Sequence, residues 1–319
     1  MTDIKELYSS RIANCIFNAF LCYTTIVLNT VTIHAIRKTS SLPKPLKTLL
    51  LCLAVSDLGV GLLVQPLYIA YLVMKLASNT ENNPAFNTTF LGFWYAMNNL
   101  LSYASFFCVT ALSVDRFLAI HLHLRYKELV THKRVVAVVT SIWVISAFLS
   151  FLWLIVAFEW TSMNIKFFYA ICASIEVACL ITTAVLYCKI YLAVRHHAHH
   201  IRALQVRQET QNGEMENSSS LRKYAMSTFY VYLVFLVCYL PQNCLYFAFI
   251  ISGTSITVDI FSLYSSTLVF LNSSLNPLIY CWKMKDVRHT VINILRKILS
   301  SQTEEKWFFK ENRSYKQQI

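Results

Sequence analysis

Long runs of apolar residues alternate with short polar segments along most of the chain. About 20 apolar residues let a helix cross the core of a bilayer, and seven runs reach that length. A transmembrane β-barrel would instead show alternating segments of about ten residues. The pattern therefore predicts an all-α membrane protein, a bundle of seven transmembrane helices. The expected helices cover residues 12–36, 48–73, 89–121, 134–158, 167–194, 224–252 and 258–282.

Composition supports this class. Of the 319 residues, 56% are hydrophobic and only 14% are charged, with a mean hydropathy of +0.49. A soluble domain of this length is far more polar. These values predict a polytopic membrane protein.

The distribution of lysine and arginine predicts the orientation. If the N-terminus lies outside, only four of the 28 basic residues lie on the outer side, namely Lys5, Arg11, Lys75 and Lys166. Cytoplasmic segments carry the excess of such residues in membrane proteins. We therefore expect an extracellular N-terminus and a cytoplasmic C-terminus. The net charge of +12 then reflects segments that face anionic lipid, and not nucleic-acid binding.

The segments around the seven runs have separate expected roles. Residues 1–11 form an extracellular N-terminus without a cleavable signal peptide, and 12–282 form the transmembrane domain. Residues 283–299 alternate bases with apolar positions, which predicts a short amphipathic eighth helix on the cytoplasmic membrane surface. Residues 300–319 form a cytoplasmic tail. The polar stretch 196–222 is interpreted as a solvated, mobile linker.

The sequence bears on two covalent features, glycosylation and disulfide bonds. Asn87 begins the sequon Asn-Thr-Thr in the expected outer loop and is the one plausible glycosylation site. All ten cysteines fall inside or at the ends of expected helices, with neither a disulfide framework nor a metal spacing. We therefore expect no disulfide.

Two acids lie deep in the apolar runs, Asp57 in LAVSDLGVGLL and Glu176 in CASIEVACL. A carboxylate is costly in lipid, so each should face the bundle interior and indicates function. Glu176 either pairs with a cationic ligand or is a protonated, hydrogen-bonded core residue. The polar residues expected to form a compact pocket for a small polar ligand are Asn98, Asn99, Ser102, Glu176, Gln242 and Tyr246.

The run 89–121 carries a polar face along its length. Asn98 and Arg116 lie eighteen positions apart, which is five turns at about 100° per residue, so they share a face with Ser102 and Ser105. Asp115 and Arg116 place an acid and a base together at the foot of this run. Such charges are tolerated only at the membrane edge or against a partner.

Prolines interrupt the last two runs. Pro241 removes a backbone donor from its helix and predicts a kink that serves as a pivot. In the final run, Asn272 and Asn276 lie one turn apart on one face, and Pro277 loosens the next turn.

These motifs together resemble the rhodopsin-like, class A family of G-protein-coupled receptors. The matching features, in order, are Asn29, LAVSDL, DRF followed by LRY, Trp143, CYLP and NPLIY, and the likeness covers residues 12–299. The resemblance implies a plasma-membrane receptor, not an enzyme, that binds an extracellular ligand and activates a heterotrimeric G protein without a cofactor. Arrestin and receptor kinases are further implied partners, with Ser300, Ser301, Thr303 and Ser314 as candidate kinase targets.

The resemblance also implies roles for single residues. An allosteric sodium pocket maps onto Asp57, Ser105, Asn272, Ser273 and Asn276. The G-protein coupling and activation switch maps onto Asp115, Arg116, Phe117, Tyr187, Phe235, Tyr239, Pro241, Asn276, Pro277 and Tyr280.

Departures from the family pattern affect the resting state. Phe117 and Tyr239 replace the usual motif residues, and Cys179 replaces the proline of the fifth helix. Leu221 stands where an acid often holds the arginine to the sixth helix. Fewer restraints on Arg116 predict high basal activity, with Asp115 as the main remaining restraint.

The branch and the ligand stay open. The usual disulfide is missing, since Leu91 occupies one position and the short loop 159–166 has no cysteine, which resembles the melanocortin branch. HLHLRYKELVT is more similar to the adenosine and amine receptors. Asn98 replaces the acid expected of amine receptors, and Phe270 replaces the lysine of opsins. An amine-like, a nucleoside-like and a peptide ligand all remain alternatives.

A proton- or ion-coupled transporter or channel is the alternative class, because two intramembrane acids would suit one. No inverted repeat or pair of broken helices is visible, however. Enzyme chemistry is disfavoured because no nucleophile and base pair appears.

Overall fold

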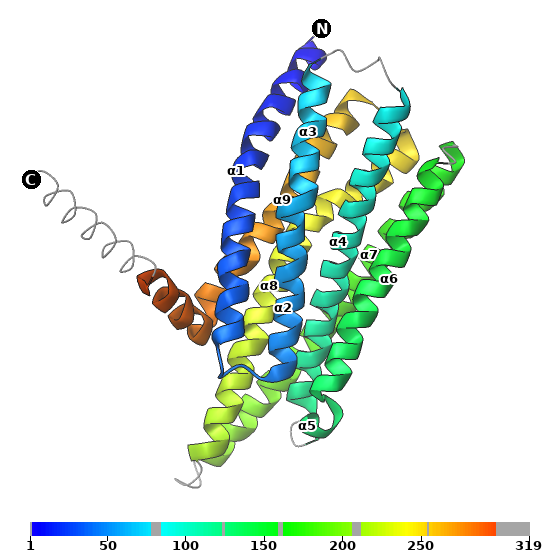
Figure 1. Cartoon of the computed structure of the whole chain (residues 1–319). Helices are drawn as coiled ribbons and strands as arrows, with labels where there is room; N and C mark the ends of the chain where they lie inside the picture. Colours follow the sequence, from blue (N-terminus) through cyan, green and yellow to red (C-terminus); the bar gives the residue numbers. More distant parts are fainter. Residues whose placement is uncertain are drawn as a thin grey trace, which may run out of the picture.

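The computed structural model describes residues 2–77, 84–122, 125–158, 162–205, 212–253 and 255–297, and these contain helices and no strand (Figure 1). The expected all-α class is confirmed. The helices are α1 (Thr2–Lys38), α2 (Lys44–Gly59), α3 (Gln65–Leu76), α4 (Pro84–His121), α5 (Tyr126–Leu129), α6 (His132–Phe158), α7 (Ser162–Gln205), α8 (Asn212–Ser252) and α9 (Ile256–Lys283). A final helix covers residues 285–297.

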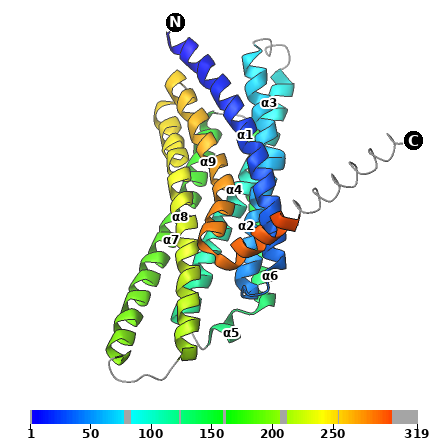
Figure 2. The same cartoon turned by 90° about the vertical axis from the view of Figure 1, so that its left-hand side faces the viewer.

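The long helices form one bundle, and α4 lies at its centre against α2, α6, α7 and α8. Helix α1 packs on α9, α2 and α3. The two views place the N-terminus at one end of the bundle, called the upper end here, and α5 at the opposite, lower end (Figures 1 and 2). The central position of α4 means that its polar face reaches most of the other helices.

The second expected span is not a uniform α-helix. A π-helical turn, Val60–Val64, separates α2 from α3, and the amide of Gln65 donates to the carbonyl of Val60. Pro66 has no amide hydrogen and cannot complete the ordinary ladder at this point. Wider turns of this kind often occur at functional sites. Here the turn changes the helix rotation between Asp57 below and Tyr68 above.

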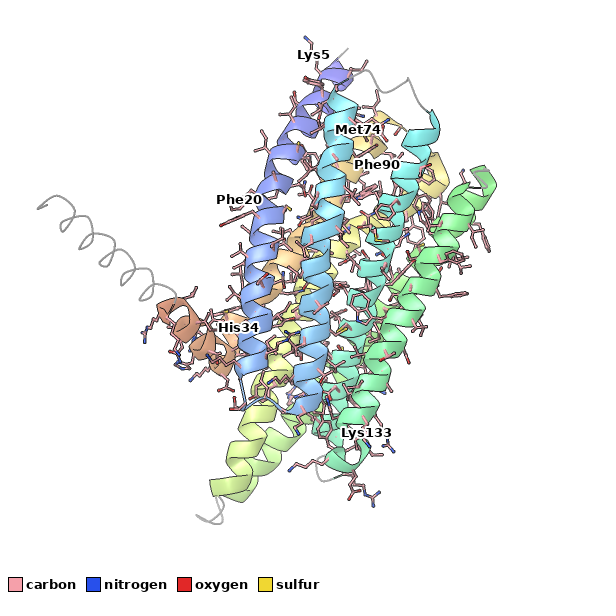
Figure 3. The ribbon with its side chains drawn as sticks, in the orientation of Figure 1. Lys5, Phe20, His34, Met74, Phe90 and Lys133 are labelled. Atoms are coloured by element: carbon pink, nitrogen blue, oxygen red, sulfur yellow. The ribbon has the colours of Figure 1, made fainter. Side chains whose placement is uncertain are left out.

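The surface of the bundle is apolar. Large exposed side chains include Phe20, Phe148, Ile181 and Val237, and Figure 3 shows Phe20 pointing outward from α1. By length and composition, six described helical stretches are suited to cross a membrane: Ile4–Lys38, Lys44–Leu76, Thr89–His121, His132–Ile155, Tyr169–Ala193 and Tyr224–Ile251. Helix α9 is of similar length but rich in serine and asparagine, and those side chains are mainly buried.

Helices extend further than the apolar runs predicted. Residues 2–11 are already helical, although they were expected to precede the first span. The interpretation of 196–222 as a linker is wrong for most of its length, because α7 continues to Gln205 and α8 begins at Asn212. Adding a residue to an existing helix is much easier than starting one, and alanine, leucine and glutamine favour this. Of the expected eighth helix, 283–299, the described residues 285–297 form a helix separate from α9, and 298–299 lie outside the described residues.

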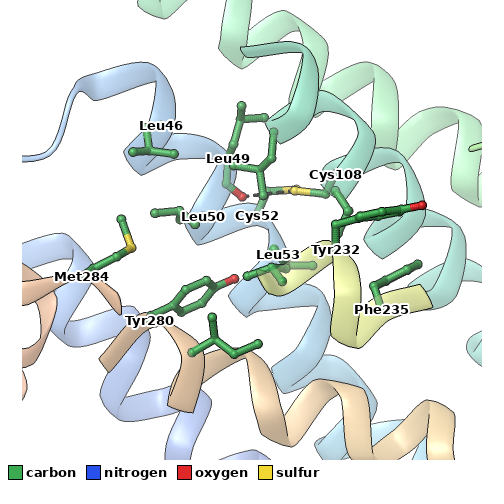
Figure 4. Close-up of a cluster of buried hydrophobic side chains, with 14 of the residues drawn as sticks. Leu46, Leu49, Leu50, Cys52, Leu53, Cys108, Tyr232, Phe235, Tyr280 and Met284 are labelled. Carbon is green, nitrogen blue, oxygen red and sulfur yellow. Dashed lines mark hydrogen bonds between the residues drawn. The ribbon is translucent and has the colours of Figure 1, made fainter. Parts of the chain in front are cut away.

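An apolar cluster fills the lower half of the bundle. Leu50 and Leu53 of α2 lie beside Tyr280, which is 1% exposed, and Leu46 belongs to the same cluster (Figure 4). Cys108 of α4 donates its thiol to the carbonyl of Leu49 at 3.1 Å. This packing joins α2, α4 and α9 beneath the polar residues described below.

A polar seam fastens α1 to α9 along most of their contact. The buried hydrogen bonds have lengths of 2.9, 2.5, 2.6 and 2.9 Å. They join Asn18 to Thr267, Thr267 to Asn14, Thr25 to Ser274, and Asn29 to the carbonyl of Ser273. Side-chain amides in lipid need such partners, because no water is available. The seam fixes the rotation of α9 and so directs its asparagines at α2.

Candidate functional site

The first polar centre surrounds Asp57, which is fully buried on α2. Asn276 of α9 donates from Nδ2 to Asp57 Oδ2 at 2.8 Å. Asn272 is fully buried one turn earlier on α9. Ser105 of α4 exchanges a hydrogen bond of 3.0 Å with Ser56 and not with Asp57. The fold therefore gathers acid, amide and hydroxyl groups between α2, α4 and α9.

This centre has unused hydrogen-bonding capacity. Asp57 Oδ1, Asn276 Oδ1 and both polar side-chain atoms of Asn272 are buried with no hydrogen-bond partner among the described residues. Buried polar atoms are nearly always satisfied, and such groups point to a bound water or ion. Oxygen ligands of this kind suit a hard cation.

The second centre is the charge pair at the lower end of α4. Arg116 is only 1% exposed, and it donates from Nε to Asp115 Oδ2 at 3.0 Å and also from Nη2 to the same oxygen. Tyr126 of α5 donates to Asp115 Oδ1 at 2.6 Å. Arg116 Nη1 has no hydrogen-bond partner in the described part of the chain. Asp115 is thus held from both sides, while the arginine retains one unused donor.

Tyr126 is the tyrosine of the LRY motif, but the sequence did not predict its contact with Asp115. Its burial, together with the neighbouring carboxylate of Asp115, raises the pKa of the phenol above its ordinary value. The phenol consequently keeps its proton and remains a hydrogen-bond donor at physiological pH. It lies in LRYKELV, next to the charge pair in sequence, so the short α5 turn brings it within reach.

The other residues expected in the activation switch lie on different helices and make separate contacts. Tyr187 of α7 stacks on Tyr232 of α8 with centroids 5.4 Å apart. The hydroxyl of Tyr280 is buried without a hydrogen-bond partner among the described residues. Phe117 stacks on His121, 4.8 Å away, along the side of α4. Neither tyrosine hydrogen-bonds to Arg116 in this conformation.

An aromatic group links the middle of α4 to α8. Phe235 and Tyr239 stack with centroids 4.3 Å apart, and Phe106 packs edge-on at 4.6 Å from Phe235 and 4.5 Å from Tyr239. Pro241 lies just above them inside α8, and Pro277 lies inside α9. The sequence predicted the α8 residues but missed Phe106 as their partner on α4.

The third centre is an upper cavity of about 300 Å³. Its wall includes aromatic groups from several helices, with Trp94 stacked on Tyr68 at 5.4 Å and Tyr169 on Tyr246 at 5.4 Å. The polar side chains that were expected to form a pocket all line it: Asn98, Asn99, Ser102, Glu176, Gln242 and Tyr246. Their part in ligand binding remains a prediction.

Glu176 is 4% exposed at the side of this cavity. Asn243 of α8 donates from Nδ2 to Glu176 Oε2 at 3.0 Å. Sequence reasoning missed Asn243, although it lies only two residues after Pro241. The bond joins α7 to α8 one turn above Tyr239.

A fourth set of contacts joins α8 to the lower end of α9 and to the helix 285–297 that follows it. Tyr224 donates to Asp286 Oδ2 at 3.1 Å, and Lys283 Nζ lies 3.9 Å from the centroid of Tyr230. The same ammonium lies 3.4 Å from the Trp282 centroid. No family motif contains Tyr224 or Asp286, so this contact was not predicted.

The glycosylation, restraint and kinase-target positions singled out from the sequence lie outside the three polar centres or outside the described residues. Asn87 falls in the first turn of α4, and Leu221 falls in α8. The candidate kinase targets Ser300, Ser301, Thr303 and Ser314 lie outside the described residues, as does the tail 300–319. All ten cysteines are free thiols.

Comparison with known proteins identifies the family. Residues 28–280 match the model of the seven-transmembrane receptors of the rhodopsin family. The histamine H1 receptor of Homo sapiens is 32% identical over 199 residues, covering 56% of this chain and 38% of the receptor. That of Gorilla gorilla gorilla is 30% identical over 221 residues, which is 63% of this chain and 42% of the receptor.

Dopamine receptor 1 of Drosophila melanogaster is 24% identical over 327 aligned positions, covering 88% of this chain and 61% of that receptor. The chain spans about two fifths of the length of the histamine receptors it matches. All three relatives are named as receptors for amines, one of the branches indicated by the sequence. The family match covers most of the chain and the motif residues from Asn29 to Tyr280. The chain therefore belongs to the rhodopsin family of seven-transmembrane receptors.

Proposed function

We propose that this protein binds a small extracellular ligand in the upper cavity and activates a heterotrimeric G protein at its lower end. The observation that carries the proposal is the geometry of α4. One helix lines the cavity with Asn98 and, eighteen positions below, holds a buried arginine that, among the described residues, forms an ion pair with its neighbour Asp115 alone. An arginine with an unused donor at a membrane edge suits a partner that arrives from the cytoplasm.

The two ends communicate through α8 in this proposal. A ligand against Glu176 and Asn243 acts on α8 close to Pro241, where the backbone ladder is interrupted. Movement of α8 repacks Phe235 and Tyr239 against Phe106 on α4. The family resemblance implies that outward movement of this helix uncovers the arginine. A ligand that binds this active conformation more tightly than the resting one shifts the receptor population toward it.

A sodium ion is proposed to stabilise the resting conformation. The carboxylate of Asp57 and the free side-chain oxygens of Asn272 and Asn276 would hold it, with Ser105 and Ser273 nearby on α4 and α9. The ion supplies a positive charge to a fully buried carboxylate that has no cation among the described residues. Binding only one of two conformations would make sodium a negative regulator.

The proposed location is the plasma membrane, with the N-terminus outside. The support is the placement of 24 of the 28 basic residues at or near the cytoplasmic side. The helix 285–297 then lies on the inner lipid surface, and the tail is available to receptor kinases and arrestin. Glycosylation of Asn87 belongs to the same topology.

Histamine and dopamine are the first ligands to examine, because the named relatives are their receptors. Asn98 does not supply the negative charge that an ammonium needs, however. Glu176 is the one acid that lines the deep part of the cavity among the described residues. An amine would therefore have to bind on α7 and not on α4.

Basal signalling tests the coupling proposal without a known ligand. We expect transfected cells to show G-protein activation above mock-transfected cells, because the family resemblance implies that an acid which would restrain Arg116 is missing at position 221. The Arg116→Ala variant should fall to the mock level at equal surface expression. Lys133→Ala, at the start of α6, is a matched loss of positive charge at the same end and should retain activity. Equal signals from all four samples would contradict the proposal.

A further inference from the structure

The charged groups of the upper cavity divide between two ends. Glu176 lies deep, whereas Lys75 lies in the last turn of α3, Asp259 in the first turn of α9, and Arg11 about three turns from the upper end of α1. None of the four belongs to an ion pair with a described residue. The cavity thus has an acidic floor and a mouth with two bases and one acid.

The acid at the floor has an unused oxygen. Glu176 Oε2 accepts the hydrogen bond from Asn243, and Oε1 accepts none from the part of the chain that the structure describes. The titratable neighbours Tyr103, Cys172 and Tyr246 are not cations. A buried carboxylate without a counterion is costly, and an ammonium would supply both the positive charge and a donor.

The mouth favours the opposite charge. Lys75 Nζ lies 5.9 Å from the centroid of Tyr71, and Tyr71, Arg11 and Asp259 line the same part of the cavity. With two bases and one acid, the described mouth has a net charge of about +1. Because Lys75 and Asp259 are exposed, attraction of an anion there is screened by salt but not abolished.

We propose that the cavity takes a zwitterionic ligand, with its ammonium on Glu176 and its carboxylate toward Arg11 and Lys75. This rests on the receptor function proposed above and names the ligand class for it. The arrangement differs from an amine site on α4, because Asn98 offers an amide while α7 offers the charge. A neutral ligand or a simple amine would leave one end of the cavity without a partner.

The depth of the cavity indicates the size of the ligand. On α9 its wall runs from Val258 to Phe270, twelve positions or about 18 Å at 1.5 Å per residue. The side chains of Glu176, Arg11 and Lys75 each extend several ångströms from the backbone and shorten the gap. An extended peptide of two or three residues, at about 3.3–3.6 Å per residue, spans the remainder. A volume of about 300 Å³ is within the range of small-ligand pockets.

The experiment uses the full chain in lipid nanodiscs. A panel of free dipeptides and tripeptides is screened by thermal shift, and affinities are then measured by titration. Each peptide that binds is compared with its N-acetyl derivative and its C-terminal amide. We expect each modification to weaken binding roughly tenfold or more, since each removes one charged contact.

Variants assign each charge to its end. Glu176→Gln should bind the free peptide and its N-acetyl derivative equally well. The double variant Arg11→Gln with Lys75→Gln should bind the free peptide and its C-terminal amide equally well. Asp259→Asn should tighten binding of the free peptide, because it removes a repulsive charge. Lys5→Gln, an exposed base of α1 that does not line the cavity, is the control and should bind as the unmodified chain does. Each preference is measured within one variant, so a loss of stability does not imitate the result.

Three outcomes would each overturn the inference. Either no peptide of the panel binds, or N-acetyl peptides bind as tightly as free peptides, or C-terminal amides bind as tightly as free peptides. Basal nucleotide exchange on a G protein is measured on the same nanodiscs. Exchange without peptide binding would reject the zwitterionic ligand and leave the receptor function standing. Charge-selective peptide binding without exchange would support the ligand class and count against G-protein coupling.

Discussion

The contact between Tyr224 and Asp286 should restrain the resting receptor. It joins the lower part of α8 to the helix 285–297 and so opposes separation of the two. Tyr224→Phe removes the hydroxyl and keeps the ring. If the bond exists only at rest, its loss shifts the population toward the active conformation, and basal activity should rise.

The size of the effect follows from the contact. A hydrogen bond to a charged group contributes about 1.5–3 kcal/mol when it is well buried. Both side chains are only half-buried, so solvent screening reduces this to roughly 1 kcal/mol. That difference corresponds to about a fivefold change in the ratio of active to resting receptor.

The assay is basal G-protein activation in cells matched for surface expression. Asp286→Ala should raise activity by a similar factor, and the double variant should exceed neither single variant, because all three lack the same bond. Tyr230→Phe keeps the ring that faces Lys283 and is the control, with no change expected. Basal activity of Tyr224→Phe equal to that of the unmodified chain would refute the restraint, as would additive effects in the double variant.

Two further predictions concern the buried polar groups. Asp57→Asn should make basal activity independent of sodium, whereas the unmodified receptor should lose activity as sodium chloride replaces choline chloride at equal ionic strength; parallel responses in membranes would rule out an ion at Asp57. Asn18→Val should lower the melting temperature in nanodiscs, because loss of the bond to Thr267 costs about 0.6–1.7 kcal/mol. Phe20→Leu, two positions away and 62% exposed, is the matched control, and an equal loss in both variants would show that the seam contributes nothing specific.

The sequence predicted the arrangement of the spans because lipid imposes a simple rule on composition. Apolar runs of bilayer length had to be helices, and polar residues within them had to face protein. The family resemblance implied that Asn276 lies near Asp57, and the two are hydrogen-bonded. The grouping of Asn98 and Glu176 around one cavity followed from the rule that lipid imposes.

Contacts that depend on helix rotation could not be predicted in this way. Glu176 and Asn243 are 67 positions apart, and whether they meet depends on how α7 and α8 turn toward each other. The π-helical turn after Gly59 changes such a rotation within a single span. The helical ends beyond the lipid were missed for another reason, since 196–205 and 212–222 are polar and carry no apolar period.

The polar seam between α1 and α9 has a consequence for the synthesis of the protein. The amides of Asn14, Asn18 and Asn29 belong to the first span to enter the membrane, and their partners belong to the last. Until α9 is inserted, those amides lack the hydroxyls and the carbonyl with which they pair in the finished bundle. A chain that ends before Thr267 would therefore keep only the bonds that these amides donate within α1 and would leave their remaining polar atoms unpaired in lipid, a feature by which membrane quality control can distinguish incomplete chains from complete ones.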